Sequence, residues 1–228
     1  MAVDPEVKGS TLMSHHHGTQ SGEAPKQLVV LLHGYGADGA DLIGLAPYLG
    51  QVLPDAAFVA PNAPFPCHMA VWGFQWFDID GASSEQRLEG ARFVDKMLQP
   101  FFDAQLEAHG VPPEELYILG FSQGMMVALH SGLRRAVQPK AVIGISGRLL
   151  ARHLLAEEMT NKPPVLLVHG DQDDVVTPEN QQAAFDALKE NGVDVESYTV
   201  AGLGHGIDEE AILKVGQFMG RIAAQTAG

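Results

Sequence analysis

Short apolar runs alternate with stretches of helical periodicity along most of the chain. The run from Gln27 to Leu32 is almost continuously apolar, which is typical of a strand that is covered on both faces. We expect strands at residues 27–32, 56–60, 116–119, 141–145, 164–169 and 193–200. Strands of this kind, separated by helices, predict an α/β fold with a mostly parallel central sheet and helices on both of its faces.

Helices are expected between these strands, at residues 41–49, 83–109, 122–136, 178–192 and 208–223. The longest helix opens with Ser83 and Gln86, which have the spacing of a capping box, and ends before Gly110. Pro100 lies inside this helix and is expected to kink it. Residues 27–228 are therefore predicted to form a single domain, in which a small loop-rich segment at about 62–82 covers the pocket.

The first 26 residues have a different character. They are rich in Gly, Ser, Thr and His and have little apolar periodicity, so we interpret residues 1–26 as a flexible N-terminal arm with room for one short edge strand. The run His15-His16-His17 in this arm is a candidate metal site, because histidine is a common metal ligand. Consecutive side chains seldom converge on one ion, so a solvated tail or a tag remnant is the favoured interpretation.

Composition narrows the range of partners and compartments. The formal net charge of −14 would repel a polyanion, so no nucleic acid partner is expected. No apolar run approaches the roughly 20 residues that span a bilayer, so no stable membrane insertion is expected. The single cysteine, Cys67, cannot form an intramolecular disulfide, which fits a cytoplasmic location.

The stretch Gly120-Phe121-Ser122-Gln123-Gly124 is the most informative motif in the chain. It follows the apolar run at 116–119 and precedes the helix-compatible run at 125–129. A strand, a sharp turn and a helix around G-x-S-x-G predict a nucleophile elbow, in which the turn exposes the serine Oγ above the sheet. Ser122 is therefore the candidate nucleophile.

A serine hydroxyl needs a base and a group that orients the base, and in this architecture both follow the serine in the chain. Four histidines lie downstream, at positions 130, 153, 169 and 205. His205 follows the last predicted strand in a glycine-rich loop, whereas His169 is expected to be buried at a strand end. Three aspartates, Asp171, Asp173 and Asp174, follow the strand at 164–169, and spacing alone leaves the choice among them open.

The first strand runs into His33-Gly34-Tyr35-Gly36, where acyl hydrolases build half of an oxyanion hole. Together with the residue after the nucleophile, this loop offers the backbone N–H groups of Tyr35 and Gln123. A glycine-rich turn can also hold phosphate. The loop, however, lacks Gly-Lys-Ser/Thr, so nucleotide binding is disfavoured.

With these pieces placed, the chain resembles the carboxylesterase/lysophospholipase family of small α/β-hydrolases, which includes acyl-protein thioesterases. The resemblance covers about residues 27–222. It is carried by residues 32–39, 76–79, 120–124 and 169–173, with a further strand-end motif at 145–149. One departure is the order Val176-Thr177-Pro178, where the family usually has valine followed directly by proline.

The resemblance implies an α/β-hydrolase fold and a triad of Ser122, Asp173 and His205. It also implies an oxyanion hole at the amides of Tyr35 and Gln123, and an aromatic residue beside the pocket at Trp76. Aromatic residues cluster in the segment 62–82, where Trp72 and Phe74 are further candidates for an apolar wall. Core packing or a contact in a possible homodimer are alternatives for these side chains.

The resulting hypothesis is a serine carboxylesterase that acts on small-molecule esters of short to medium chain length. The alternative within the same chemistry is a lysophospholipase or an acyl-(protein) thioesterase. A non-catalytic binding protein of the same fold, or an interaction module with exposed aromatics, would require the complete triad to be a coincidence. No cofactor and no metal are implied.

Overall fold

The computed structural model describes residues 12–225. Within this part of the chain, seven strands form one sheet in the order β1-β3-β2-β6-β7-β8-β9. These strands are β1 (Ser14–His17), β2 (Gln27–Leu32), β3 (Ala56–Pro61), β6 (Leu116–Phe121), β7 (Ala141–Ile145), β8 (Val165–Gly170) and β9 (Val195–Val200). Every pairing is parallel except that of β1 with β3. The predicted α/β fold with a mostly parallel sheet is confirmed.

Seven α-helices of the described residues connect or cover the strands. They are α1 (Gly39–Leu42), α2 (Ala46–Leu49), α3 (Ser84–His109), α4 (Gln123–Gly132), α5 (Leu155–Glu158), α6 (Glu179–Glu190) and α7 (Glu209–Ala224). Short 3₁₀ helices lie at Ile43–Leu45, Pro113–Glu115 and Arg152–Leu154. The expected helix at 41–49 is therefore a succession of three short helical pieces.

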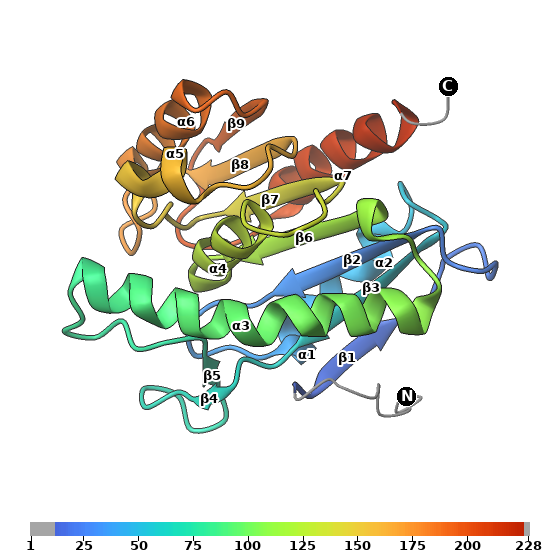
Figure 1. The fold of residues 1–228 in the computed structure, drawn as a ribbon, viewed down its shortest axis with the longest axis horizontal. Coiled ribbons are helices and arrows are strands. Elements are labelled where there is room, and N and C mark those ends of the chain that lie inside the picture. The colour runs from blue at the N-terminus through green and yellow to red at the C-terminus, as the bar shows by residue number, and fades with distance from the viewer. Residues whose placement is uncertain (1–11, 226–228) are drawn as a thin grey trace.

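Two hydrophobic cores lie on opposite sides of the sheet. Because neighbouring side chains of a strand point to opposite faces, Val30 belongs to the core that includes residues of α3, α4 and α6, whereas Val29 belongs to the core that includes residues of α1, α2 and α7. Figure 1 shows α3 running along one face of the sheet. The strands are buried on both faces, which explains their continuous apolar sequences.

Helix α3 begins as its sequence predicts. The Ser83 hydroxyl accepts a hydrogen bond from the Gln86 N–H, and the Gln86 side chain accepts one from the Ser83 N–H. Gly110 caps the other end with a φ of 66°, a left-handed conformation that suits glycine. The helix continues through Pro100 rather than ending there.

The N-terminal arm contributes strand β1 to the edge of the sheet. Successive side chains of a strand point to opposite faces, so the three histidines at 15–17 do not converge. His16 stacks on His109, and His17 packs edge-on against Phe58. Residues 1–11 of the predicted arm lie outside the described residues.

The segment at 62–82 contains a small hairpin of two-residue strands, β4 (Phe65–Pro66) and β5 (Phe74–Gln75), which are antiparallel. In Figure 1 this hairpin projects below α3. Two backbone hydrogen bonds attach it to the loop after β2: Gly36 donates to Phe74, and Phe74 donates to Ala37. The hairpin is thereby held beside the carboxyl end of the sheet.

Candidate active site

Ser122 lies at the sharp turn between β6 and α4. Its backbone has a φ of 53° and a ψ of −113°, which L-residues rarely adopt. Both flanking glycines are required by the close approach of backbone atoms. A Cβ on Gly120 would overlap the carbonyl group of Gly124, and a Cβ on Gly124 would overlap the carbonyl group of Leu32. The turn thus has the geometry of a nucleophile elbow.

Ser122, His205 and Asp173 come together at the carboxyl ends of β6, β9 and β8. The Nε2 atom of His205 lies 3.0 Å from the Ser122 Oγ, and its Nδ1 atom lies 2.8 Å from the Asp173 Oδ2. An ionised carboxylate only accepts hydrogen bonds, so Nδ1 donates and Nε2 is left to accept the serine proton. The ring of Phe121 packs beside the imidazole, with centroids 5.1 Å apart.

Asp173 is buried and held as an anion. Burial alone would raise the pKa of its carboxyl group. The hydrogen bond from His205 and the backbone N–H groups of Val176 and Val175 outweigh burial, and the pKa lies below its ordinary value. Of the other two candidates, Asp171 accepts from the Gly202 N–H, and Asp174 is exposed.

His169 was expected to be a buried strand-end residue, and it is fully buried. It also has a contact that sequence reasoning missed. Its Nε2 atom lies 2.7 Å from the carbonyl oxygen of Val176 and 3.1 Å from the Asp173 Oδ2. The spacing of His169 and Asp173 in His-Gly-Asp-Gln-Asp was the available signal.

The loop after β2 lies against the serine. A Cβ on Gly34 would be 3.3 Å from the Ser122 Cβ, so this loop and the elbow face each other. Among the described residues, the backbone N–H groups of Tyr35 and Gln123 donate to no acceptor. Two unpaired N–H groups beside a serine Oγ are what an oxyanion hole requires. The Tyr35 hydroxyl donates to Asp80 on the segment 62–82.

The Gln123 side chain connects the elbow to the same segment. Its Oε1 accepts from the Trp76 N–H at 2.9 Å, and its Nε2 donates to the Phe77 carbonyl oxygen at 2.6 Å. The Trp76 indole donates to the His33 carbonyl oxygen at 2.9 Å. Burial also lowers the pKa of the His33 imidazole, which packs against the Trp76 ring.

These contacts change the expected roles of the aromatic residues. Trp76 is 0% exposed, so it supports the loop after β2 from within the core instead of lining a pocket. Trp72 is 88% exposed and lines no described cavity. Phe74 is half-buried and packs against the core. Sequence reasoning could not make these distinctions, because aromatic residues suit core, pocket and surface positions alike.

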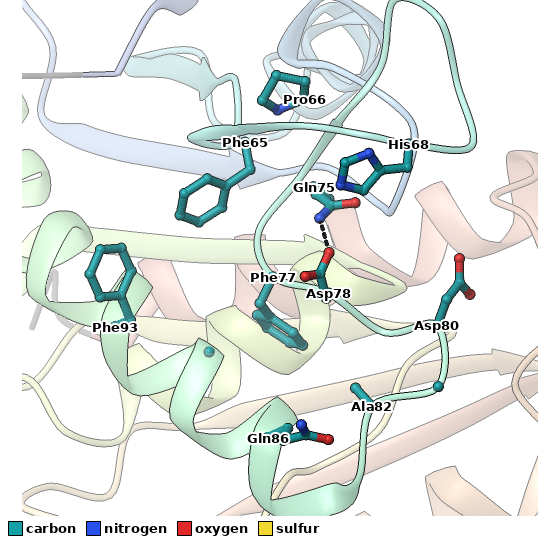
Figure 2. Close-up of a pocket in the computed structure, with 12 residues that line it drawn as sticks. Phe65, Pro66, His68, Gln75, Phe77, Asp78, Asp80, Ala82, Gln86 and Phe93 are labelled. Carbon is teal, nitrogen blue, oxygen red and sulfur yellow. Dashed lines mark hydrogen bonds between the residues drawn. The ribbon is translucent and has the colours of Figure 1, made fainter.

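A cavity of about 690 Å³ lies between the hairpin and α3 (Figure 2). Phe65 and Phe93 face each other across it, with ring centroids 6.0 Å apart, and Phe77 lies deeper (Figure 2). Gln75 and Asp78 share a hydrogen bond at its wall. No triad residue lines this cavity; its link to the elbow is the Phe77 carbonyl oxygen, which accepts a hydrogen bond from the Gln123 side chain.

The parallel sheet, the elbow and the serine, histidine and aspartate at the strand ends define the α/β-hydrolase fold. A family model described as phospholipase/carboxylesterase matches residues 15–222. The chain belongs to this family, and the predicted resemblance is confirmed. The match begins earlier than the resemblance seen in the sequence and includes most of β1.

Individual relatives point to the same class. Esterase YpfH from Escherichia coli strain K12 is 30% identical over 205 residues, which cover 88% of this chain and 85% of that protein. Acyl-protein thioesterase 1 homolog 1 from Dictyostelium discoideum is 29% identical over 201 residues, 85% of this chain and 89% of that protein. The crystal structure of esterase PE8 has a TM-score of 0.88 and 39% identity, covering 92% of this chain and 99% of that one. The prediction of a carboxylic ester hydrolase is confirmed at the level of enzyme class.

Residues 12–225 contain neither a candidate metal site nor a candidate membrane span. No group of three or more His, Cys, Asp or Glu side chains is placed to hold a metal ion there. In the same residues, no helix has the length and apolar character needed to cross a membrane. Cys67 is a free, buried thiol.

Proposed function

We propose that this protein hydrolyses small carboxylic esters of short to medium chain length through an acyl-enzyme on Ser122. The observation that carries the proposal is the continuous pair of hydrogen bonds from Ser122 through His205 to Asp173. Such a pair makes a weak nucleophile competent, because the imidazole can take the serine proton as Oγ attacks.

In the first step the Ser122 Oγ attacks the ester carbonyl carbon while His205 Nε2 accepts the proton. Asp173 keeps His205 in the tautomer with a proton on Nδ1 and stabilises the imidazolium that forms. The N–H groups of Tyr35 and Gln123 stabilise the oxyanion of the tetrahedral intermediate. His205 then protonates the leaving alcohol.

In the second step His205 takes a proton from water as the water attacks the acyl carbonyl carbon, and it returns the proton to the Ser122 Oγ as the carboxylic acid is released. These steps require no metal and no organic cofactor. We assign the apolar acyl or alcohol group of the substrate to the cavity lined by Phe65, Phe77 and Phe93, which the Phe77–Gln123 hydrogen bond connects to the elbow. The cytoplasmic location and the homodimer considered in the sequence analysis are still predictions, and this mechanism depends on neither.

A thioester or lysophospholipid substrate is the second candidate, because the same triad cleaves both kinds of bond. Its support is the likeness to a protein named as an acyl-protein thioesterase homolog. Hydrolysis of long-chain acyl thioesters that exceeds hydrolysis of short esters would favour it.

The direct test is hydrolysis of p-nitrophenyl esters from acetate to palmitate by the wild type and Ser122→Ala. We expect kcat to fall at least about a thousandfold in Ser122→Ala, the scale seen when a triad member is removed. Ser131→Ala is the matched control, since Ser131 is a buried serine on α4 away from the elbow. Near-normal turnover by Ser122→Ala would overturn the mechanism, and a maximum at long chains would overturn the proposed chain length.

A further inference from the structure

A second cavity, of about 490 Å³, lies at the same edge of the sheet as the triad. Its walls come from the start of α3, the loop after β7 and the start of α6. The side chains that matter to its chemistry are Ser84, Arg87, Arg148, Arg152, His153 and Asn180. The proposed mechanism uses none of these groups; Arg87 donates to the Ile79 carbonyl oxygen, and Asn180 donates to Thr177.

The arginines of this cavity differ from all the others in the chain. Arg92, Arg134, Arg135 and Arg221 each form a salt bridge with a carboxylate. Within residues 12–225, the arginines that have no carboxylate partner are Arg87, Arg148 and Arg152. In a chain with a formal net charge of −14, carboxylates are abundant, so their absence from this one pocket leaves it locally cationic.

The arrangement also leaves donors without acceptors. The Nε atoms of Arg87 and Arg148 are buried and have no hydrogen-bond partner among the described residues. Burial lowers the pKa of the Arg148 guanidinium, and the charge of Arg87 lowers it further. Both side chains are half-buried and like-charged, so an anion between them would offset their mutual repulsion and accept from their free Nε–H groups.

The cavity is close to the nucleophile. Strand β7 pairs with β6, and the Ser122 N–H donates to the Ile145 carbonyl oxygen at 2.8 Å. Gly147 contacts the elbow so closely that a Cβ there would overlap the Ser122 carbonyl oxygen. Arg148 is the next residue, so its backbone belongs to the loop that borders the serine.

We propose that this pocket is a binding site for phosphate. The phosphate is either the free ion or a phosphate group on the alcohol portion of an ester substrate. Guanidinium groups bind phosphate oxygens in pairs, and the Ser84 hydroxyl adds a neutral donor. As a substrate subsite, the pocket depends on the function proposed above.

Calorimetric titration with inorganic phosphate at constant ionic strength tests the site without requiring turnover. We expect the wild type to bind phosphate and Arg148→Gln and Arg87→Gln to bind it about 10- to 100-fold more weakly, the scale of a charge-assisted hydrogen bond. Arg152 is exposed, so Arg152→Gln tests the pocket with least risk to folding. Arg221→Gln removes a paired, exposed arginine elsewhere and serves as the control. Absent binding, or equal binding by all variants, would overturn the proposal.

The source of the phosphate is tested with two esters that share an acyl group, monobutyrylglycerol and monobutyrylglycerol phosphate. A preference in kcat/KM for the phosphate ester that Arg148→Gln abolishes supports a substrate subsite. Phosphate binding without that preference supports a site for free phosphate. Ser122-independent or absent hydrolysis of both esters, with phosphate binding intact, would overturn the proposed function and leave the site standing.

Discussion

Two serines at neighbouring strand ends have backbone conformations that are rare for residues other than glycine. Ser122 has a φ of 53° and Ser146 a φ of 50°. Each is anchored by its own N–H, which donates to the carbonyl oxygen of the adjacent strand, Ile145 for Ser122 and Val168 for Ser146. Strain of this kind costs about 1–3 kcal/mol and persists where surrounding contacts determine the backbone. At Ser122 the result is a side chain directed toward His205.

Asp173 offers a prediction at the scale of one atom. In Asp173→Asn the side chain keeps its size, but an amide can donate to His205 Nδ1 and so favour the wrong imidazole tautomer. We expect kcat for p-nitrophenyl butyrate to fall roughly ten-thousandfold, with KM little changed. Steady-state kinetics of the purified variant measure both constants.

Asp174→Asn is the matched control, because Asp174 is the exposed neighbour in the same loop. It should retain wild-type kcat. If the Asp174 variant loses as much activity as the Asp173 variant, the carboxylate that orients His205 has been misassigned.

At this scale the sequence predicted the candidate nucleophile and base, but not the contacts of their neighbours. G-x-S-x-G between a strand and a helix pointed to Ser122, and the order of the chain pointed to His205. Three aspartates within four residues left the orienting carboxylate open, since the turn decides which one faces inward. The bonds of the Gln123 side chain to residues 76 and 77 join segments 46 or more positions apart. No local pattern could have predicted them.

At the scale of elements, prediction succeeded where periodicity or capping was strong. The long helix begins at its capping box and ends at Gly110, and the strand at 27–32 has its predicted bounds. The β4–β5 hairpin was not predicted, because strands of two residues have too few positions to show alternation. The hairpin is nevertheless the element that positions the cavity in Figure 2.

The hairpin and the elbow are joined by Gln123, which yields a prediction on stability. In Gln123→Ala the buried Trp76 N–H and Phe77 carbonyl group lose their partners, and the loss should cost about 2 kcal/mol. Urea denaturation should therefore give a lower free energy of unfolding. Activity should also fall, because the hairpin holds the loop that contains the Tyr35 N–H.

Gln182→Ala is the comparison for this variant. Gln182 is exposed on α6, where its amide bonds Asp186, so its loss should change the free energy of unfolding little. Equal stability of the wild type and Gln123→Ala would show that the bridge does not hold the two elements together.

The whole molecule is acidic, and its charges are unevenly distributed. The paired arginines include Arg92 and Arg134, which meet Glu158 between α3, α4 and α5. The three unpaired ones gather at the carboxyl edge of the sheet. The net charge of −14 and the local cationic pocket together favour binding of a compact anion. A polyanion would extend beyond the pocket and be repelled by the acidic surface around it.

The buried imidazole of His130 makes the free energy of unfolding of the whole protein depend on pH under acidic conditions. Burial on α4 lowers its pKa to about 4 from an ordinary 6.5; Arg134 and Arg92 lower it too, whereas Asp95 and Glu158 oppose them. Between those two values the unfolded chain binds more protons than the folded one, so stability falls as pH decreases from 6.5 toward 4. His130→Gln removes this titration, and from pH 7 to pH 4.5 it should lose about 2 kcal/mol less stability than the wild type. Urea unfolding across this pH range measures the difference.

His68→Gln is the control, because His68 is an exposed histidine. Its free energy of unfolding should change with pH as that of the wild type does. The same pH dependence in all three proteins would refute a role for His130.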